Sequence, residues 1–249
     1  ITTKCRLGNP KNKDVYDILN NSLCRSLETM NVEKVNLFLL HSQLIEDDYE
    51  LYKFNEGREK STTTLSCYFN AVIPAFARLK LEGKIDHWGI GLGQEEALIK
   101  AINYSEPPEA MQCAVNILNS IGSIGYISKK SNPNKILEAC QINQIPILAI
   151  RAAQAGALTS TMDREPHASG ADVDDFNDYK KAAPFRELAK EWGHSPASLA
   201  HRYALSVKNV SSVILGIKNR VELKECLKAE EKGKLKPHEM EILNGMFED

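Results

Sequence analysis

Val35-Asn36-Leu37-Phe38-Leu39-Leu40-His41 is the stretch that decides the fold. Five of its seven residues are apolar, which is typical of a strand buried on both faces of a parallel sheet. The stretch ends on an imidazole, and one strand earlier residues 1–4 end on Lys4. In barrels of alternating strands and helices, the carboxyl ends of the strands carry the chemistry. Lys4 and His41 therefore form a candidate acid/base site, although alone each would more often be a solvated lysine or a packed histidine.

Strand-like and helix-like patterns alternate along the whole chain. Strands are predicted at residues 1–4, 35–40, 87–92, 111–116, 145–150 and 212–215. Helices are predicted at residues 15–30, 65–81, 94–102, 133–141, 185–192, 197–205, 220–230 and 237–247. Two polar segments, residues 43–63 and 159–182, are predicted loops, the second of them mobile, and are the better candidates for substrate contact. This order predicts right-handed βαβ units and a parallel sheet with helices outside.

The number of predicted strands leaves two architectures open. Six parallel strands fit an open doubly wound sheet, whereas a closed barrel of this type needs eight. The doubly wound fold is disfavoured because its glycine fingerprint is missing, and the nearest candidate, Gly89-Ile90-Gly91-Leu92-Gly93, has the wrong spacing. We therefore expect one domain over residues 1–249, an α/β (β/α)8 TIM barrel of which about six βα units are present.

Composition narrows the class of function. The chain has 249 residues, 43% of them hydrophobic, and a formal charge of −2, which argues against nucleic acid as the main partner. No apolar run approaches the ~20 residues that cross a bilayer, so no membrane partner is expected. The cysteines and histidines show no metal-type spacing, so no metal site is predicted. Scattered cysteines without a CxxC pair indicate a reduced, cytoplasmic setting. The cysteines are Cys5, Cys24, Cys67, Cys113, Cys140 and Cys226.

Short motifs across nearly the whole chain match one family in order and spacing. They are ITTK (1–4), VNLFLLHS (35–42), EGKI (82–85), GIG (89–91), QCAVN (112–116), QAGALT (154–159), SPASLA (195–200), VILG (213–216) and LKE (223–225). Together they resemble the aldo-keto reductases, in particular a divergent bacterial-type member.

The resemblance implies a barrel that binds NADPH across its carboxyl face and reduces small aldehydes or ketones to alcohols. It also implies that residues 1–4 are the third of eight strands, and that the chain is truncated at its amino terminus. Of the family's catalytic Asp, Tyr, Lys and His, Lys4 and His41 can be matched, whereas the Asp and the Tyr are expected upstream. Residues 1–249 alone are therefore expected to reduce no carbonyl compound.

The resemblance also marks residues that would bind the cofactor. Gln112 would hold the nicotinamide carboxamide and Arg151 the pyrophosphate. Gly216, Lys218 and Arg220 would grip the adenosine 2′-phosphate at the amino end of a helix, where backbone N–H groups favour an anion. Glu225 would contact the adenine amino group.

Several positions depart from the family pattern. The common Ser-Asn is replaced by Gly91-Leu92, and Ile150 stands where many members have an aromatic ring. The usual lysine and arginine at positions 216 and 222 are replaced by Gly216 and Glu222, so that Lys218 and Arg220 would substitute for them. The departures at Gly91-Leu92 and Ile150 suggest a looser nicotinamide pocket.

Two other functions are consistent with the same residues. The weakened nicotinamide contacts would suit a non-catalytic NADPH-binding module with a regulatory or sensory role. An unrelated barrel enzyme could instead use Lys4 to form a Schiff base, which would require a desolvated lysine. The substrate and the oligomeric state are left open by the sequence.

Overall fold

The chain folds into two compact units. The structure, a computed structural model, describes residues 1–53, 55–125, 127–128 and 131–247. Unit 1 comprises the described residues of Ile1–Gln112, Tyr126–Lys130 and Lys135–Pro146, and unit 2 those of Cys113–Gly125, Ser131–Asn134 and Ile147–Asp249. Within the described residues no helix has both the length and the apolar character needed to cross a membrane. The expectation of a single domain over residues 1–249 stays a prediction.

A parallel sheet forms the centre of unit 1. Its strands are β1 (Thr2–Cys5), β2 (Val35–Leu40), β5 (Ile85–Ile90) and the first half of β6 (Met111–Ala114), and they neighbour one another in that order. Every pairing in this series is parallel, and β2 is buried at all positions except Asn36. The predicted α/β fold with a parallel sheet is therefore confirmed. The predicted strand at 87–92 was displaced, because β5 begins and ends two residues earlier.

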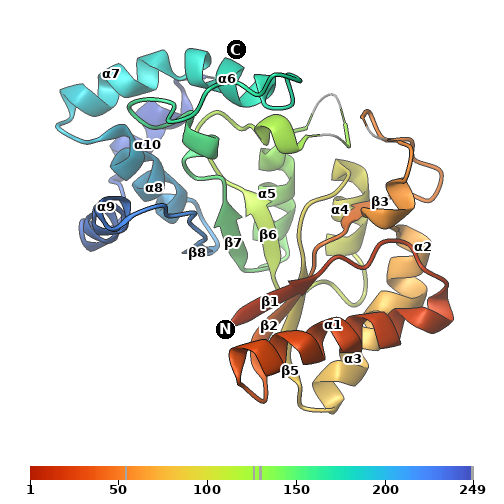
Figure 1. Cartoon of the computed structure of the whole chain (residues 1–249). Coiled ribbons are helices and arrows are strands. Elements are labelled where there is room, and N and C mark those ends of the chain that lie inside the picture. Colours follow the sequence, from red (N-terminus) through yellow and green to blue (C-terminus); the bar gives the residue numbers. More distant parts are fainter. Residues whose placement is uncertain (54, 126, 129–130, 248–249) are drawn as a thin grey trace. The chain divides into compact units, whose positions relative to one another are not determined.

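Helices α1 (Val15–Met30) and α3 (Ile73–Leu81) lie side by side along β1, β2 and β5 (Figure 1). Val15, Leu19 and Leu23 recur every four residues on α1 and are all fully buried, because that spacing places them on one helix face. The helix ends at Asn31, whose φ of 52° is the left-handed conformation of many helix ends. The helix predicted at residues 15–30 is thus confirmed.

The helix predicted at residues 65–81 is interrupted. It consists of α2 (Leu65–Cys67), a π-helical turn over Tyr68–Val72, and α3. Pro74 explains the interruption, because it has no N–H to donate and its ring clashes with the carbonyl four residues earlier. Beyond the turn, Phe76 of α3 stacks on Trp88 of β5, with ring centroids 5.2 Å apart.

Segment 43–64 is more ordered than the predicted loop. Strands β3 (Gln43–Ile45) and β4 (Thr62–Thr64) pair in parallel within it. The loop prediction is therefore wrong at both ends, since each strand has only three residues and is too short to show a periodic pattern. Helix α4 (Glu95–Ile102) and most of α5 (Pro133–Ile142) complete unit 1.

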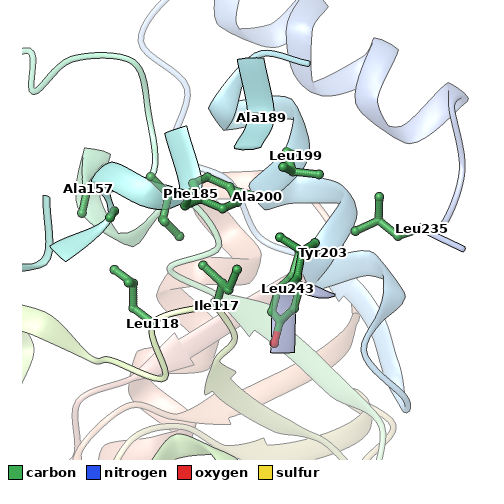
Figure 2. Close-up of a cluster of buried hydrophobic side chains, with 12 residues drawn as sticks. Ile117, Leu118, Ala157, Phe185, Ala189, Leu199, Ala200, Tyr203, Leu235 and Leu243 are labelled. Atoms are coloured by element: carbon green, nitrogen blue, oxygen red, sulfur yellow. The ribbon is translucent and has the colours of Figure 1, made fainter. Parts of the chain in front are cut away.

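Unit 2 combines a parallel strand pair with a helical layer. Strand β7 (Ile147–Ile150) pairs with β8 (Val210–Val213), which begins two residues before the predicted strand. The helices are α6 (Val173–Lys181), α7 (Ala183–Glu191), α8 (Pro196–Ser206), α9 (Arg220–Glu231) and α10 (Pro237–Asn244). Figure 2 shows the core of this unit, in which Phe185 of α7 and Leu199 of α8 are fully buried.

Helix α6 lies inside the segment predicted to be a mobile loop, residues 159–182. The prediction is wrong over Val173–Lys181. The helix carries little apolar surface, and the one residue of it that is buried is the carboxylate Asp175. Hydrophobic periodicity, the usual signal for a helix, is therefore absent from the sequence here.

Candidate active site

The ends of β1 and β2 bring Lys4 and His41 to one face of unit 1. Lys4 is paired with Leu39, and the backbone N–H of His41 donates to the carbonyl of Cys5 (2.7 Å). Because side chains alternate along a strand, Lys4, Leu39 and His41 project to the same side of the sheet. The next residue, Ser42, is buried and accepts a hydrogen bond from the N–H of Gly8 (2.7 Å), which anchors the end of β2.

The electrostatic environment favours a neutral imidazole at His41. Burial is the largest cause that lowers its pKa below the ordinary value, and the charges of Lys4 and Arg6 add to it. A neutral imidazole keeps one N–H to donate and one nitrogen to accept, so His41 can orient a carbonyl oxygen by hydrogen bonding.

Lys4 is exposed on its strand. A Schiff-base lysine is activated by desolvation, which this position does not provide. The exposure therefore disfavours the alternative in which Lys4 forms a covalent adduct. It remains compatible with a lysine that acts through its charge on a neighbouring group.

A tyrosine phenol beside Lys4 and His41 would be a candidate proton donor. The chain has eight tyrosines, of which Tyr126 lies outside the described residues. The other tyrosines all contact groups other than Lys4 and His41. Their partners are Glu82 for Tyr16, Ile127 for Tyr49, Lys53 for Tyr52, Phe69 and Trp88 for Tyr68, Phe69 for Tyr104, Ser160 for Tyr179 and Asn244 for Tyr203. Within the described residues, none of these contacts joins a tyrosine to Lys4 or His41.

Gln112 lies close to the same strand ends. It is 9% exposed, and a Cβ added at Gly91 would be 3.6 Å from its Oε1 atom. The same Cβ would also lie 3.6 Å from the carbonyl oxygen of Leu40, the residue before His41. The glycine at position 91 thus leaves room for the Gln112 amide beside the end of β2. Unit 1 brings together three of the predicted site residues: Lys4, His41 and Gln112.

The other predicted site residues belong to unit 2, where Arg151 follows β7. Its guanidinium forms an ion pair with Asp175 of α6, and its Nε donates to Gln154 Oε1 (2.8 Å). The arginine side chain is 14% exposed, and burial lowers its pKa. An anion that uses Arg151 would therefore have to compete with a carboxylate that is already bound.

Loop 214–219 and the start of α9 carry the predicted 2′-phosphate site. Gly216 has open space around it, whereas the Lys218 ammonium is paired with Asp163. The Asn219 side chain accepts from the N–H groups of Val221 (2.9 Å) and Glu222 (3.0 Å). Asn219 thus caps the helix, as its residue type favours, and an anion would share these two N–H groups with it. The 2′-phosphate site stays a prediction.

Arg220 and Glu225 differ in their exposure and in their hydrogen bonding. Arg220 is the exposed first residue of α9. Glu225 accepts a hydrogen bond from the hydroxyl of Ser195, the residue that caps α8. An adenine contact at Glu225 would have to share this carboxylate with Ser195.

One sequence comparison decides the family. The model of the aldo/keto reductase family matches residues 1–248. The chain belongs to the aldo/keto reductase family. No curated protein matches it by sequence.

Solved structures of aldo/keto reductases share the fold. One is aldo-keto reductase AKR11C1 from Bacillus halodurans, which is 17% identical and has a TM-score of 0.68 in its apo form and 0.69 in its holo form. In both forms the match covers 98% of this chain and 70% of the other. Another is the thermostable aldo-keto reductase Tm1743 in complex with the inhibitor epalrestat, which is 21% identical with a TM-score of 0.65. That match covers 99% of this chain and 70% of Tm1743.

The aldo/keto reductase motifs did not reveal a buried polar network in unit 2. Its central residue is Gln154, which is fully buried and donates to Asp178 Oδ2 (2.6 Å). Asn116, which is 5% exposed, donates to Gln154 Oε1 (3.2 Å). Arg164 reaches Asp175 Oδ2 (3.1 Å) and the carbonyl of Ala155 (2.6 Å). Asn116 and Gln154 stand in the motifs QCAVN and QAGALT, and the acidic residues at 172–178 are the further sequence signal for this network.

Proposed function

We propose that this aldo/keto reductase is an NADPH-dependent oxidoreductase that reduces aldehydes or ketones to alcohols, with Lys4 and His41 supporting a tyrosine proton donor. The observation that carries the proposal is the placement of Lys4 and His41 on one face, at the carboxyl ends of adjacent parallel strands. Membership of the family supports an oxidoreductase, and we infer the two residue roles from the geometry.

The reaction explains why a cation and a neutral imidazole are needed together. The reduced nicotinamide would supply a hydride, which leaves negative charge on the carbonyl oxygen. A phenol has a pKa near ~10, and a neighbouring ammonium such as Lys4 lowers it toward the range in which a proton is readily exchanged. His41 would donate a hydrogen bond to the same oxygen, because its pKa is held below the ordinary value and the ring is neutral.

Residues that would contact the cofactor are assigned within each unit separately. Gln112 would hold the carboxamide, since the gap at Gly91 leaves its amide beside the end of β2. Arg220 is the exposed cation best suited to a 2′-phosphate, and Lys218 would contribute after release from Asp163. Arg151 and Glu225 would contribute to the pyrophosphate and the adenine in exchange for their present partners, Asp175 and Ser195.

A non-catalytic NADPH-binding module is the second candidate. It is favoured by one observation, that Gly91-Leu92 and Ile150 stand where the family has groups that contact the nicotinamide. A sensor needs the cofactor contacts but no proton donor. The two functions therefore predict the same binding and different chemistry.

Cofactor binding is tested by titrating residues 1–249 with NADPH and NADH and following the fluorescence of each. We expect NADPH to bind at least about tenfold more tightly, corresponding to about 1.4 kcal/mol. Arg220→Gln should remove most of this preference. Lys228→Met, which deletes another cation of α9, is the matched control and should leave the preference unchanged. Equal binding of both cofactors would contradict the proposed NADPH specificity, and no binding of either would contradict both functions.

Chemistry is tested by NADPH oxidation with benzaldehyde, in the presence and absence of added phenol as a substitute proton donor. An enzyme should turn over slowly or not at all without phenol, and its rate should rise with phenol concentration. Lys4→Met should abolish the rescue, because the added phenol then loses the cation that lowers its pKa. If NADPH binds but added phenol does not raise the rate of its oxidation, the result would favour the sensory module.

A further inference from the structure

Helix α6 is attached to the rest of unit 2 mainly through carboxylates. Asp175 accepts from the backbone N–H of Ser123 (3.0 Å), and its own N–H donates to the Ser123 hydroxyl (3.2 Å). One turn further on, Asp178 accepts from Ser120 Oγ (2.7 Å) and from Gln154 Nε2 (2.6 Å). Both carboxylates thus hold α6 against the segments that follow β6 and β7.

Asp175 also bridges two arginines. Its Oδ1 is paired with Arg151, and its Oδ2 accepts from Arg164 Nη2 (3.1 Å). The side chains of Asp175 and Arg151 are only 7% and 14% exposed, so water contributes little to their neutralisation. The Arg151 guanidinium therefore depends on a nearby anion, because an unpaired buried charge is costly. Arg164 is 34% exposed and is also paired with Asp172.

The backbone around this cluster lies very close to the side chains of the ion pair. A Cβ at Gly122 would overlap Asp175 Oδ1 and would lie 2.6 Å from Arg151 Nη2, so only glycine fits above the ion pair. Arg151 and Gln154 themselves have positive φ angles of 56° and 46°, which non-glycine residues adopt at a cost. Strain of this kind is characteristic of functional segments whose surroundings hold it in place.

A carboxylate between two arginines can be exchanged for another anion. Guanidinium groups bind phosphoryl oxygens in the same forked geometry as carboxylates, and a diphosphate offers more charge and more oxygens than one aspartate. The exchange keeps Arg151 and Arg164 paired, so the cost of an uncompensated buried charge does not arise.

We propose that Asp175 is an internal anionic latch, which fastens α6 to Arg151 and Arg164 and gives up both arginines to the diphosphate of a bound dinucleotide. The identity of that anion rests on the proposed function. On this view α6 opens when the cofactor binds. Asp178 also holds the helix in place, but it does not compete with the anion for the arginines.

The latch is tested in the full chain with Asp175→Asn and Asp178→Asn, a matched pair on the same helix. Asp175→Asn should tighten NADPH binding by about tenfold, because it removes the competing state from the equilibrium. Asp178→Asn should tighten binding by less than Asp175→Asn, because it loosens α6 but leaves Asp175 on both arginines, and both variants should speed amide hydrogen exchange of residues 173–181. Glu187→Gln, an equal charge change at an exposed site of α7, should alter neither measurement. The latch is overturned if Asp175→Asn binds NADPH no more tightly than Asp178→Asn.

A second measurement on the unmodified protein uses inorganic pyrophosphate as the probe. Pyrophosphate should speed exchange of residues 173–181, relative to sodium chloride of equal ionic strength. If neither the unmodified protein nor any variant binds NADPH, the proposed function fails and pyrophosphate alone decides about the latch. Faster exchange then supports an anion-released latch, whereas unchanged or slower exchange overturns it.

Discussion

Gly89→Ala tests whether the β5–β6 junction is as tightly packed as the structure shows. Gly89 lies opposite Leu39 in the parallel pairing of β2 with β5. A Cβ at this position would lie 2.9 Å from Leu39 Cδ2 and would overlap the carbonyl oxygen of Ala110. Ordinary van der Waals contact requires about 3.4–4 Å, so either the Leu39 side chain or the β6 edge must move.

The cost can be worked from these two neighbours. Leu39 is 1% exposed, and overpacking of a core costs about 1–3 kcal/mol. Ala110 O accepts the N–H of Ile90 (3.2 Å), a bond whose loss costs about 1 kcal/mol. The lower entropy of the unfolded alanine chain returns about 0.4–1 kcal/mol. The net expectation is a destabilisation of about 1–3 kcal/mol, or a Tm lower by about 2–12 °C in a chain of this size.

Urea unfolding followed by circular dichroism and by tryptophan fluorescence measures this change, and Trp88 is adjacent to the substitution. Gly216→Ala is the matched control, because no atom lies within 4 Å of the added Cβ. It should change the free energy of unfolding by less than about 0.5 kcal/mol. If Gly89→Ala is as stable as Gly216→Ala, the close approach of β2, β5 and β6 at this position is refuted.

Three further changes probe other parts of the fold. Burial, and then the charges of Lys232 and Arg202, lower the pKa of His194, so the unfolded state binds the proton more tightly. The stability this histidine contributes is present above its unfolded pKa of about 6.5 and is lost as the pH falls. His194→Gln should therefore reduce the loss of Tm between neutral and mildly acidic pH, and an unchanged pH profile would contradict the assignment. Asn219→Ala should cost about 1 kcal/mol by removing the cap of α9, whereas Asn219→Asp should retain most of it, as measured by urea unfolding. Leu23→Ala should cost about 2–5 kcal/mol because the side chain is fully buried, and a smaller change in the same assay would refute tight packing of α1.

Elements with a strong hydrophobic period were predictable from the sequence. The bounds of α1 and β2 agree with the expectation at both ends. The apolar residues of α1 recur at the helical spacing, and those of β2 form a run that only Asn36 interrupts. The π-helical turn before α3 was not predicted, although Pro74 was its visible cause. Helix α6 was missed because its buried residue is the carboxylate Asp175 and polar contacts contribute much of its attachment.

In the candidate site, too, some features were predictable from the sequence and others were shown only by the structure. Lys4 and His41 were identified from their positions at strand ends, and the parallel register of β1 and β2 places both on one face. Strand order and residue alternation are local properties, so a sequence pattern carries them. The structure brings Gln112 to the same strand ends through the space left at Gly91.

The sequence by itself determined the parallel α/β architecture and the strand-end pair, because both follow from hydrophobic periodicity along short segments. Only the tertiary structure decided which predicted cofactor cations already have partners. Arg151 meets Asp175 from a helix 24 residues later, and Lys218 meets Asp163 from 55 residues earlier. The physical reason is that an ion pair depends on the distance between two charges in space, and no period in the sequence encodes that distance.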